Sequence, residues 1–442
     1  MYPGYPGYPG RSGRSLAVLL GLAGLAAGCE VVHFIGENTR PACHLDSECA
    51  LPAVCDTAHG VCATPTPATY FDILFVIDNS PSMAGRQKGL VASIPGFLRK
   101  LDTALTNIDY RIGIVTSDVG TDPAPDQQWS GGITSCDTFL GDDGLLQATP
   151  CTSRFPLSPE SAEVCKTFCP DPSFVPYKND LFISKFGSAF NVPFDLKTDA
   201  QNGQVNLGPQ RAFACMAVLG DAGCGVEGQL EAARRALNGH RAENAYFLRP
   251  DSLLAVIFLT DEDDCSVQPG RRGENSPQTY DCPIPSQSAP FECFNADYRC
   301  LARDVKCDEP LITPGDKHNC REHADSYLEP VQSYVDFFAK LRPSNRLFVG
   351  GIWTLPALDE GGQLTVATVP GGVGTEALNR VHAPCSGTSS SYPGAPQLRL
   401  SKLARHFRGH LEADLCDALG YPAALQSMAA MMLTMAGVQA AP

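Results

Sequence analysis

Two stretches of the chain combine carboxylate and hydroxyl groups in a way that suits metal binding. Asp78, Ser80 and Ser82 alternate along one loop, and Asp261 follows Thr260 at the end of a distant apolar run. Carboxylate and hydroxyl oxygens are the ligands that hard cations take in proteins. The sequence therefore predicts a site for a divalent cation, Mg²⁺ or Ca²⁺. The alternative is that these are polar strand-end residues in a fold that holds no ion.

Four apolar runs predict the strands that would position these residues. Each run is almost continuously apolar, which is typical of a parallel strand buried on both faces. The runs are Tyr70–Asp78, Tyr110–Ser117, Leu253–Asp261 and Arg346–Trp353. Apolar residues recur at helical spacing between and after the runs, within 90–105, 230–237 and 327–341. This alternation predicts a doubly wound, mostly parallel α/β sheet, in which ligands bind beyond the carboxyl ends of the strands.

The segment Asp78-Asn79-Ser80-Pro81-Ser82 resembles the Asp-x-Ser-x-Ser signature of the von Willebrand factor A domain. The resemblance implies a Rossmann-like fold and a metal-ion-dependent adhesion site. In that family an aspartate after the fourth strand and a threonine from a second loop complete the site. Asp261 matches the aspartate, whereas the loop 223–230 offers Glu227 in about the position of the threonine. The expected metal ligands are therefore Asp78, Ser80, Ser82, Glu227 and Asp261.

The resemblance also implies a function in adhesion, with a protein or polysaccharide as the partner. In adhesive members of the family an acidic group of the partner completes the coordination of the ion. A third protein carboxylate at Glu227 would weaken that capture, so a mainly structural ion, preferably Ca²⁺, is a second hypothesis. Glu227 could also be a helix N-terminal residue favoured by the dipole. Asp263 and Asp264 could hold a second cation, although a solvated acidic turn is the simpler interpretation.

The N-terminal region has the features of an export signal with a lipid attachment site. Arg11 and Arg14 precede an apolar stretch, Leu16–Gly28, that is too short to span a bilayer but suits a signal peptide. It ends in Leu25-Ala26-Ala27-Gly28-Cys29, which resembles the lipobox of bacterial lipoproteins. The resemblance implies a lipid on Cys29 and a place in the cell envelope, at the outer membrane and periplasmic or surface-facing, with the lipid as the only membrane anchor. The alternative is ordinary secretory cleavage, which leaves Cys29 to form a disulfide.

Four closely spaced cysteines follow the predicted anchor. The segment 41–62 is poor in large apolar residues, so cross-links rather than a core must stabilise it. The four cysteines are Cys43, Cys49, Cys55 and Cys62. They allow three disulfide pairings, and the sequence does not choose among them. The segment resembles the cysteine-rich repeats of bacterial surface lipoproteins; a cross-linked spacer is the simplest interpretation, and 63–68 is expected to be an extended linker.

Composition narrows the class of protein. The chain has 442 residues, of which 43% are hydrophobic, as in globular proteins. The net charge of −15 argues against a nucleic-acid partner, which needs a concentrated basic surface. The 19 cysteines include no C-x-x-C pair, so disulfides in an oxidising compartment are expected. We find no P-loop, His-Glu-x-x-His motif or nucleophile elbow and expect no enzyme. A hydrolase whose ion activates water stays open as an alternative.

These observations predict three parts of the chain. Residues 1–28 form the signal peptide, 29–69 the small cysteine module with its linker, and 70–442 the α/β domain. Two cysteine-rich insertions, at about 119–222 and 264–322, interrupt that domain. The layout as a whole resembles lipoproteins of myxobacteria and their relatives. The sequence predicts neither the identity of the partner nor the oligomeric state.

Overall fold

A computed structural model describes the chain from Ala42 to Val438, with gaps. The gaps are residues 58, 65, 105–107, 121–140, 155, 178–179, 200–202, 224–226, 263, 269–304, 310–314, 323–325, 327, 359–363, 370–379 and 382–395. The predicted signal peptide, Cys29 and Asp263 lie outside the described residues. Among those residues, no helix is both long and apolar enough to cross a membrane.

A seven-stranded, mostly parallel sheet organises the domain. The strand order is β17-β13-β9-β3-β4-β5-β6, and only β5 and β6 run antiparallel to their neighbours. The strands are β3 (Tyr70–Ile77), β4 (Asp109–Thr116), β5 (Ile183–Phe186), β6 (Ala189–Phe190), β9 (Leu253–Thr260), β13 (Leu347–Trp353) and β17 (Gly409–Asp414). The chain is therefore an α/β protein, as the sequence predicts.

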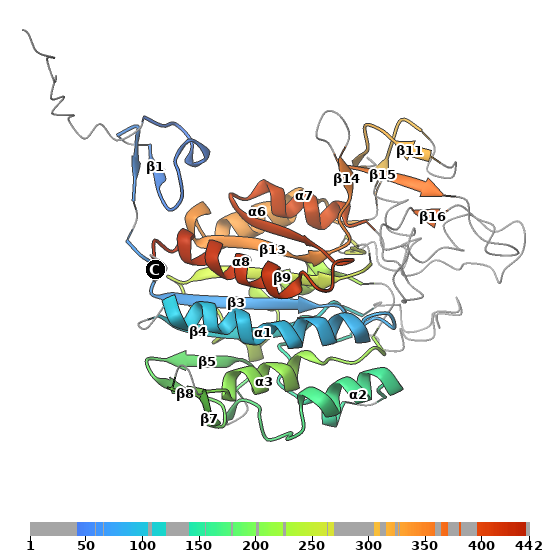
Figure 1. Cartoon of the computed structure of the whole chain (residues 1–442). Helices are drawn as coiled ribbons and strands as arrows, with labels where there is room; N and C mark the ends of the chain where they lie inside the picture. Colours follow the sequence, from blue (N-terminus) through green and yellow to red (C-terminus); the bar gives the residue numbers. More distant parts are fainter. Residues whose placement is uncertain are drawn as a thin grey trace, which may run out of the picture. The chain divides into compact units, whose positions relative to one another are not determined.

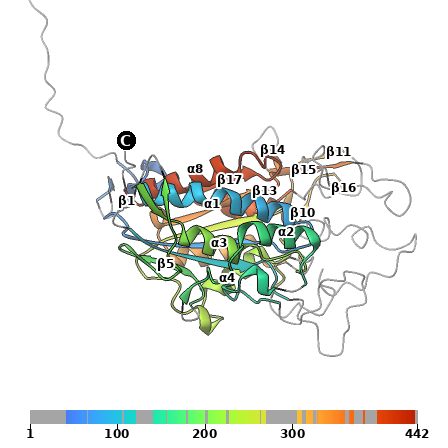
Figure 2. The same cartoon turned by 60° about the horizontal axis from the view of Figure 1, so that its bottom comes forward.

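Helices cover both faces of this sheet. One face carries α1 (Ala84–Ala104), α2 (Pro159–Phe168), α3 (Gly208–Ala217) and α8 (Tyr421–Met435). Helix α1 lies between α8 and α3 on that face (Figures 1 and 2). The opposite face carries α4 (Gln229–Leu237), α6 (Val331–Leu341) and α7 (Leu398–His406). The doubly wound arrangement gives the sheet a hydrophobic core on each side.

Strand β3 shows how one strand serves both cores. Phe71, Ile73, Phe75 and Ile77 pack into the core beneath α1, whereas Leu74 and Val76 pack into the core beneath α4 and α6. Successive side chains of a strand point to opposite faces, so a strand covered on both faces needs apolar residues at almost every position. This explains why the central strands appear in the sequence as continuous apolar runs.

Several short strands lie outside the main sheet. Two antiparallel pairs are β7 (Leu196–Asp199) with β8 (Gly203–Asn206) and β10 (Val305–Lys306) with β12 (Arg321–Glu322). A further small sheet consists of β11 (Gly315–Lys317), β14 (Ala357–Leu358), β15 (Leu364–Val369) and β16 (Arg380–Val381). Single 3₁₀ turns occupy Asp46–Glu48, Cys151–Ser153, Ala242–Asn244 and Ser344–Arg346.

Disulfides cross-link the cysteine module and the segments that interrupt the α/β pattern. The module has a small hairpin, β1 (Val54–Asp56) with β2 (Val61–Ala63). Its disulfides join Cys43 to Cys55 and Cys49 to Cys62. In the rest of the described chain, further disulfides are Cys151–Cys165, Cys169–Cys215 and Cys307–Cys320. The first two of these fix α2 and α3, which pack into the core beside α1.

The linker after the module lies against the domain. Ala68 is buried, and its backbone N–H donates to the carbonyl of Ala436, 3.0 Å away, at the end of α8. Arg346 donates to the carbonyl of Thr66 at 3.2 Å, and Arg408 donates to the carbonyl of Ala53 at 3.2 Å. The domain thus offers hydrogen-bond partners to both the linker and the module.

Candidate metal centre

The sheet brings the two predicted halves of the site to one edge. Strands β3 and β9 pair in parallel with Ile77 opposite Leu259, so the residues that follow them emerge side by side. The backbone N–H of Asp78 continues this pairing by donating to the carbonyl of Leu259 at 2.9 Å. Asp78 and Asp261 therefore lie at the carboxyl edge of adjacent strands, although 183 positions separate them in the sequence.

A chain of hydrogen bonds links the loop after β3 to Asp261. The Asp78 Oδ1 atom accepts a hydrogen bond from the backbone N–H of Ser80 at 2.8 Å, which folds the loop into a tight turn before α1. The hydroxyl oxygens of Ser80 and Ser82 are 3.3 Å apart. The hydroxyl of Ser82 in turn donates to Asp261 Oδ1 at 2.9 Å. Four of the five predicted ligands thus lie along one run of contacts.

Asp78 is fixed from the neighbouring strands as well. Its Oδ2 atom accepts a hydrogen bond from the Thr260 hydroxyl at 2.7 Å, and Ser117 at the end of β4 lies 3.5 Å from Oδ1. The carboxylate has no exposed surface. Burial raises the pKa of Asp78 above its ordinary value, although the hydrogen bonds from Ser80 and Thr260 act in the opposite direction.

Glu227 reaches the same edge from the loop before α4. Its neighbour Gly228 donates a backbone hydrogen bond to the carbonyl of Ser117 at 2.9 Å, and Cys265 donates to the carbonyl of Glu227 at 2.7 Å. The side chain is 1% exposed, and its Oε1 atom has no hydrogen-bond partner among the described residues. Burial, followed by the charges of Glu262 and Asp78, raises the pKa of Glu227 well above its ordinary value. Glu227 therefore shares the electrostatic field of the site.

Gln87 ties the loop after β3 to the segment that leads to Glu227. Its amide nitrogen donates to the carbonyls of Asp78 and Gly220, at 3.0 and 2.7 Å. Its amide oxygen accepts from the backbone N–H of Gly220 at 3.2 Å. A buried side chain with both amide atoms engaged holds these two segments in fixed register.

The arrangement fits a hard cation but limits how the cation is held. Buried carboxylates that repel one another cost free energy, and a divalent cation relieves that cost. The carboxylate oxygens of Asp78, Asp261 and Glu227, all described, do not lie within 4.8 Å of one another as a group of three. Asp78, Ser80, Ser82 and Asp261 would hold the cation, and their carboxylate and hydroxyl oxygens are the ligands that a hard cation prefers.

Arg86 brings a positive charge to the site. Its Nε atom lies 4.0 Å from Asp261 Oδ2, and its side chain comes from the first turn of α1. This guanidinium offsets part of the charge that the Asp261 carboxylate carries when it is ionised.

Asp264 has a structural role that differs from the sequence interpretation. The acidic turn after β9 is not solvated at this residue, because Asp264 has no exposed surface. Its carboxylate accepts hydrogen bonds from Arg399 Nε at 2.9 Å and from the backbone N–H of Leu230 at 2.9 Å. Asp264 thus caps α4 and pairs with a buried arginine of α7. It is not part of the candidate centre.

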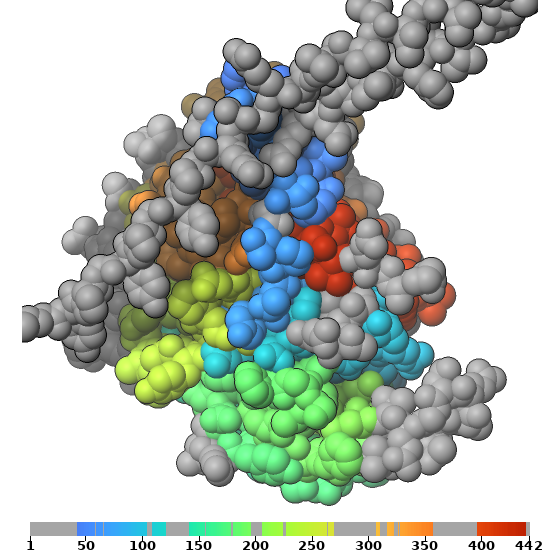
Figure 3. All heavy atoms as spheres, turned by 90° about the vertical axis from the view of Figure 1, so that its left-hand side faces the viewer, coloured from blue at the N-terminus to red at the C-terminus, as the bar shows by residue number. Residues whose placement is uncertain are grey.

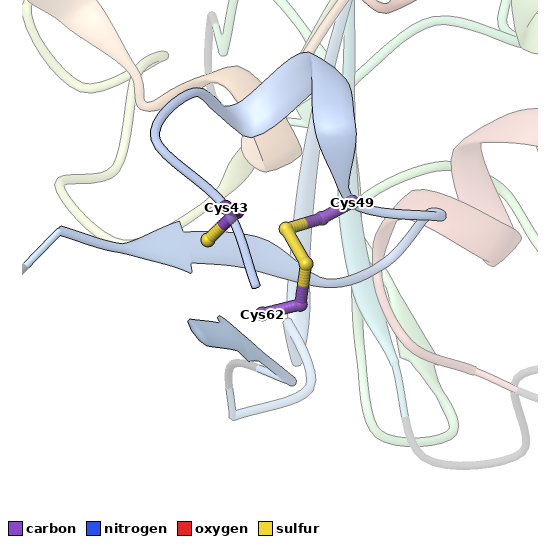
Figure 4. A group of neighbouring side chains, drawn as sticks. All are labelled: Cys43, Cys49 and Cys62. Atoms are coloured by element: carbon purple, nitrogen blue, oxygen red, sulfur yellow. A yellow bond between two sulfur atoms is a disulfide. The ribbon is translucent and has the colours of Figure 1, made fainter. Parts of the chain in front are cut away.

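The cysteine module contains a second group of potential ligands. The sulfurs of Cys43, Cys49 and Cys62 lie within 4.8 Å of one another (Figure 4). Cys49 and Cys62 share one disulfide, and Cys43 is joined to Cys55 by the other. A thiolate is the form of cysteine that binds metals, and a disulfide removes it. In the cross-linked protein this group is a disulfide cluster and not a metal site.

Three polar residues of the centre are absent from the sequence prediction as functional residues. Gln87, Gln229 and Glu262 are all buried near the site. Gln229 donates to the hydroxyl of Thr260 at 2.9 Å and to the carbonyl of Glu262 at 3.1 Å. The sequence carries no distinctive signal for these three residues, because their partners come from other segments of the chain.

A scan against known protein families finds no match, and a search of curated proteins finds none either.

Proposed function

We propose that this protein is an exported, lipid-anchored bacterial envelope protein with a von Willebrand factor A-type domain that binds a divalent cation. In this proposal the ligands are Asp78, Ser80, Ser82 and Asp261, and the Glu227 carboxyl lies in the electrostatic field of the site. Through the cation the domain binds a protein or polysaccharide partner. The observation that carries the proposal is the run of contacts from Ser80 through Ser82 to Asp261 at the carboxyl edge of two adjacent strands.

Two further observations support the envelope part of the proposal. Disulfides persist in oxidising compartments and are rare in the cytosol. The described part of the chain has five disulfides with both partners placed, distributed from the module to residue 320. The lipobox-like sequence before Cys29 supplies the anchor in this proposal.

A second candidate function is an envelope protein whose ion only stabilises the fold. The burial of the site favours it, because Asp78, Ser80 and Asp261 have no exposed surface and Ser82 is only half-buried. An ion at such a site stabilises the folded state by mass action even when no partner reaches it. The two candidates share the cation and differ in whether a partner completes its coordination.

Calorimetric titration with Mg²⁺ and Ca²⁺ tests the shared claim. We expect one ion per chain for the wild type and binding at least about ten-fold weaker for Asp261→Asn, because the substitution removes one charge and keeps the shape. Glu243→Gln, which removes an exposed carboxylate of the turn Ala242–Asn244, is the matched control and should bind as the wild type does. Equal binding by all three proteins would refute the site.

A pull-down from envelope extract then separates the two candidates. The adhesive function predicts a partner that is retained with the preferred ion, lost in chelator and lost with Asp261→Asn. Binding of the ion without any cation-dependent partner would favour the structural function.

A further inference from the structure

Exposed aromatic side chains gather at the edge of the sheet opposite the candidate metal centre. Tyr246 is 81% exposed, Phe186 75%, Phe194 65% and Tyr70 37%. We call these four residues the amino-edge aromatics. Large apolar side chains at the surface are unremarkable one by one, but several at one edge mark a contact surface.

Tyr70 and Phe186 lie where the parallel strands begin. Tyr70 is the first residue of β3, whereas Asp78 and the site follow the last residue of that strand. Phe186 ends β5 beside the start of β4, because Gly187 donates its backbone N–H to Asp109 Oδ1 at 2.6 Å. Both side chains therefore lie at the amino edge of the sheet.

The other two follow from the segments that precede β9 and α3. Arg249 pairs with Asp72 and stacks 4.7 Å from the ring of Tyr70, which sets the segment with Tyr246 at the start of β3. Phe194 precedes Asp195, whose carbonyl accepts a hydrogen bond from the backbone N–H of Leu207 at 2.8 Å, directly before α3. Because α3 ends near Gly220 at the carboxyl edge, its beginning lies at the amino edge.

Figure 3 looks onto this amino edge. The segments that carry the amino-edge aromatics meet there: the start of β3 in blue, the end of β5 and the segment before α3 in green, and the segment before β9 in yellow-green. Four stretches of chain that are far apart in sequence thus lie close together on this face.

Positive charge accompanies the aromatic rings. Arg111 donates to the carbonyl of Phe247 at 3.3 Å, and Arg346 donates to the carbonyl of Asp251 at 2.7 Å. Both guanidinium groups are half-buried, whereas the third at this edge, that of Arg249, is neutralised by Asp72. Aromatic rings combined with arginines suit the boundary between lipid headgroups and acyl chains, where a ring needs an apolar environment and the cation meets phosphate.

The N-terminal part of the chain joins the domain at this same edge. The linker runs from the module through Thr66 and Ala68 directly into Tyr70, and Arg346 holds Thr66 in place. Leu45 on the module is 64% exposed as well. Only 12 residues separate Cys29 from Ala42, the first described residue. A lipid on Cys29 would keep the module close to a bilayer.

We propose that the amino edge, through the amino-edge aromatics, binds the surface of a phospholipid bilayer. The orientation that follows deepens the proposed function and depends on its lipid anchor: the candidate metal centre, at the carboxyl edge, faces away from the membrane and toward a partner. Direct binding of the edge to lipid does not depend on the cation.

Flotation with vesicles of phosphatidylethanolamine and phosphatidylglycerol tests the proposal. The protein is the mature chain with Cys29→Ser, so that no lipid is attached to it. We expect this protein to float with the vesicles, and Phe186→Ser with Tyr246→Ser to lower the partition coefficient at least about ten-fold, because two rings no longer enter the interface. Leu419→Ser, which removes a side chain 94% exposed just before α8 at the carboxyl edge, is the matched control and should change partition less than two-fold.

Two results would overturn the proposal. One is that the Cys29→Ser protein does not bind the vesicles. The other is that the Cys29→Ser protein binds them with the same partition coefficient whether or not it also carries Phe186→Ser and Tyr246→Ser. A dimer that the double variant dissociates, seen by sedimentation velocity without any lipid binding, would assign the edge to a second copy instead. Asp261→Asn should leave partition unchanged, so failure of the cation site and failure of the lipid surface are distinguishable.

Discussion

Thr260 connects the candidate metal centre to its surroundings through a single hydroxyl. That hydroxyl donates to Asp78 Oδ2 and accepts from the Gln229 amide and from the backbone N–H of Glu262, 3.2 Å away. It therefore orients a proposed ligand and also ties it to the first residue of α4. We interpret Thr260 as a positioning residue that acts through Asp78.

Replacement of Thr260 by valine keeps the shape and removes the hydroxyl. We expect the affinity for the cation to fall about ten-fold, because the Asp78 carboxylate loses the donor that fixes it, and stability to fall by about 1–3 kcal/mol from the unsatisfied groups left behind. Calorimetric titration and urea unfolding measure the two effects separately. Thr260→Ser should restore both, and a valine variant that binds the ion as tightly as the wild type would show that the hydroxyl has no positioning role.

Glu227 makes stability depend on pH when no cation is bound. Burial raises its folded-state pKa well above the ordinary 4.5. The carboxyl is protonated in both states below pH 4.5, so its contribution to stability is fully present there. As pH rises toward the folded-state pKa, only the unfolded state ionises freely. The free energy of unfolding then falls by about 1.4 kcal/mol for each pH unit between the unfolded-state and folded-state pKa values.

Urea unfolding between about pH 4.5 and 7.5 in metal-free buffer measures this loss. We expect Glu227→Gln to flatten the decline, since a neutral side chain has nothing to ionise, and saturating Ca²⁺ to flatten it in the wild type. A wild type with the same slope in the presence and absence of the ion would contradict a cation in the field of Glu227.

The convergence of the proposed ligands is predictable at the residue scale because these residues follow directly from strand ends. Asp78 and Asp261 sit one position beyond buried apolar runs, and parallel strands place such positions together. Gln87 and Gln229 were not predictable, because their partners are backbone carbonyls and hydroxyls from other segments. Asp264 was misinterpreted for the same reason: its partner, Arg399, is 135 positions away in a helix with no distinctive pattern.

The central strands of the sheet are easier to predict from the sequence than its edge strands. Strands β3, β4, β9 and β13 are buried on both faces and match the four predicted runs. Strand β17, Gly-His-Leu-Glu-Ala-Asp, is an edge strand that is mostly half-buried, so it lacks a continuous apolar run. The sequence does not predict helices α2 and α3, because they lie in a stretch rich in proline, glycine and cysteine. Disulfides there add to the stabilisation that the core provides.

The Asp264–Arg399 pair joins three elements: the end of β9, α4 and α7. Asp264→Asn removes the negative charge that faces the buried Arg399 guanidinium, and we expect a loss of about 3–5 kcal/mol in unfolding free energy. Adding Arg399→Met should recover much of it, because the buried positive charge is then gone as well. Urea unfolding of the two variants measures this, with Asp308→Asn, in an exposed ion pair with Arg321, as a control that should change the free energy of unfolding by less than about 1 kcal/mol. If Asp264→Asn does not lower the free energy of unfolding, the pair does not hold these elements together.

At the scale of the whole molecule, the cysteine module is part of the described unit and not a free spacer. Its backbone carbonyls at Cys49 and Ala53 accept hydrogen bonds from Arg408, and Asp46 accepts one from Ser344. The sequence does not reveal these contacts, because every residue has a backbone carbonyl that can accept a hydrogen bond. The predicted anchor at Cys29 lies outside the described residues and stays a prediction.

Arg408→Ala should release the module from the domain. The loss of its hydrogen bonds to the module lowers the free energy of local opening by about 2 kcal/mol, so cleavage in the linker 63–68 should become about thirty-fold faster. Limited proteolysis followed by mass spectrometry measures the rate and the cut site. Arg405→Ala, in the last turn of α7 and paired with Glu412, is the control. Unchanged cleavage with Arg408→Ala would mean that other contacts hold the module.

The central claim is that one divalent cation sits at the carboxyl edge of β3 and β9. Anomalous X-ray diffraction from crystals grown with Mn²⁺, which substitutes for Mg²⁺ at oxygen sites, locates such an ion directly. The account predicts one strong peak within bonding distance of the hydroxyls of Ser80 and Ser82, with Asp78 and Asp261 beside it. The absence of a peak there in protein saturated with Mn²⁺, or a bound ion only elsewhere, would contradict it.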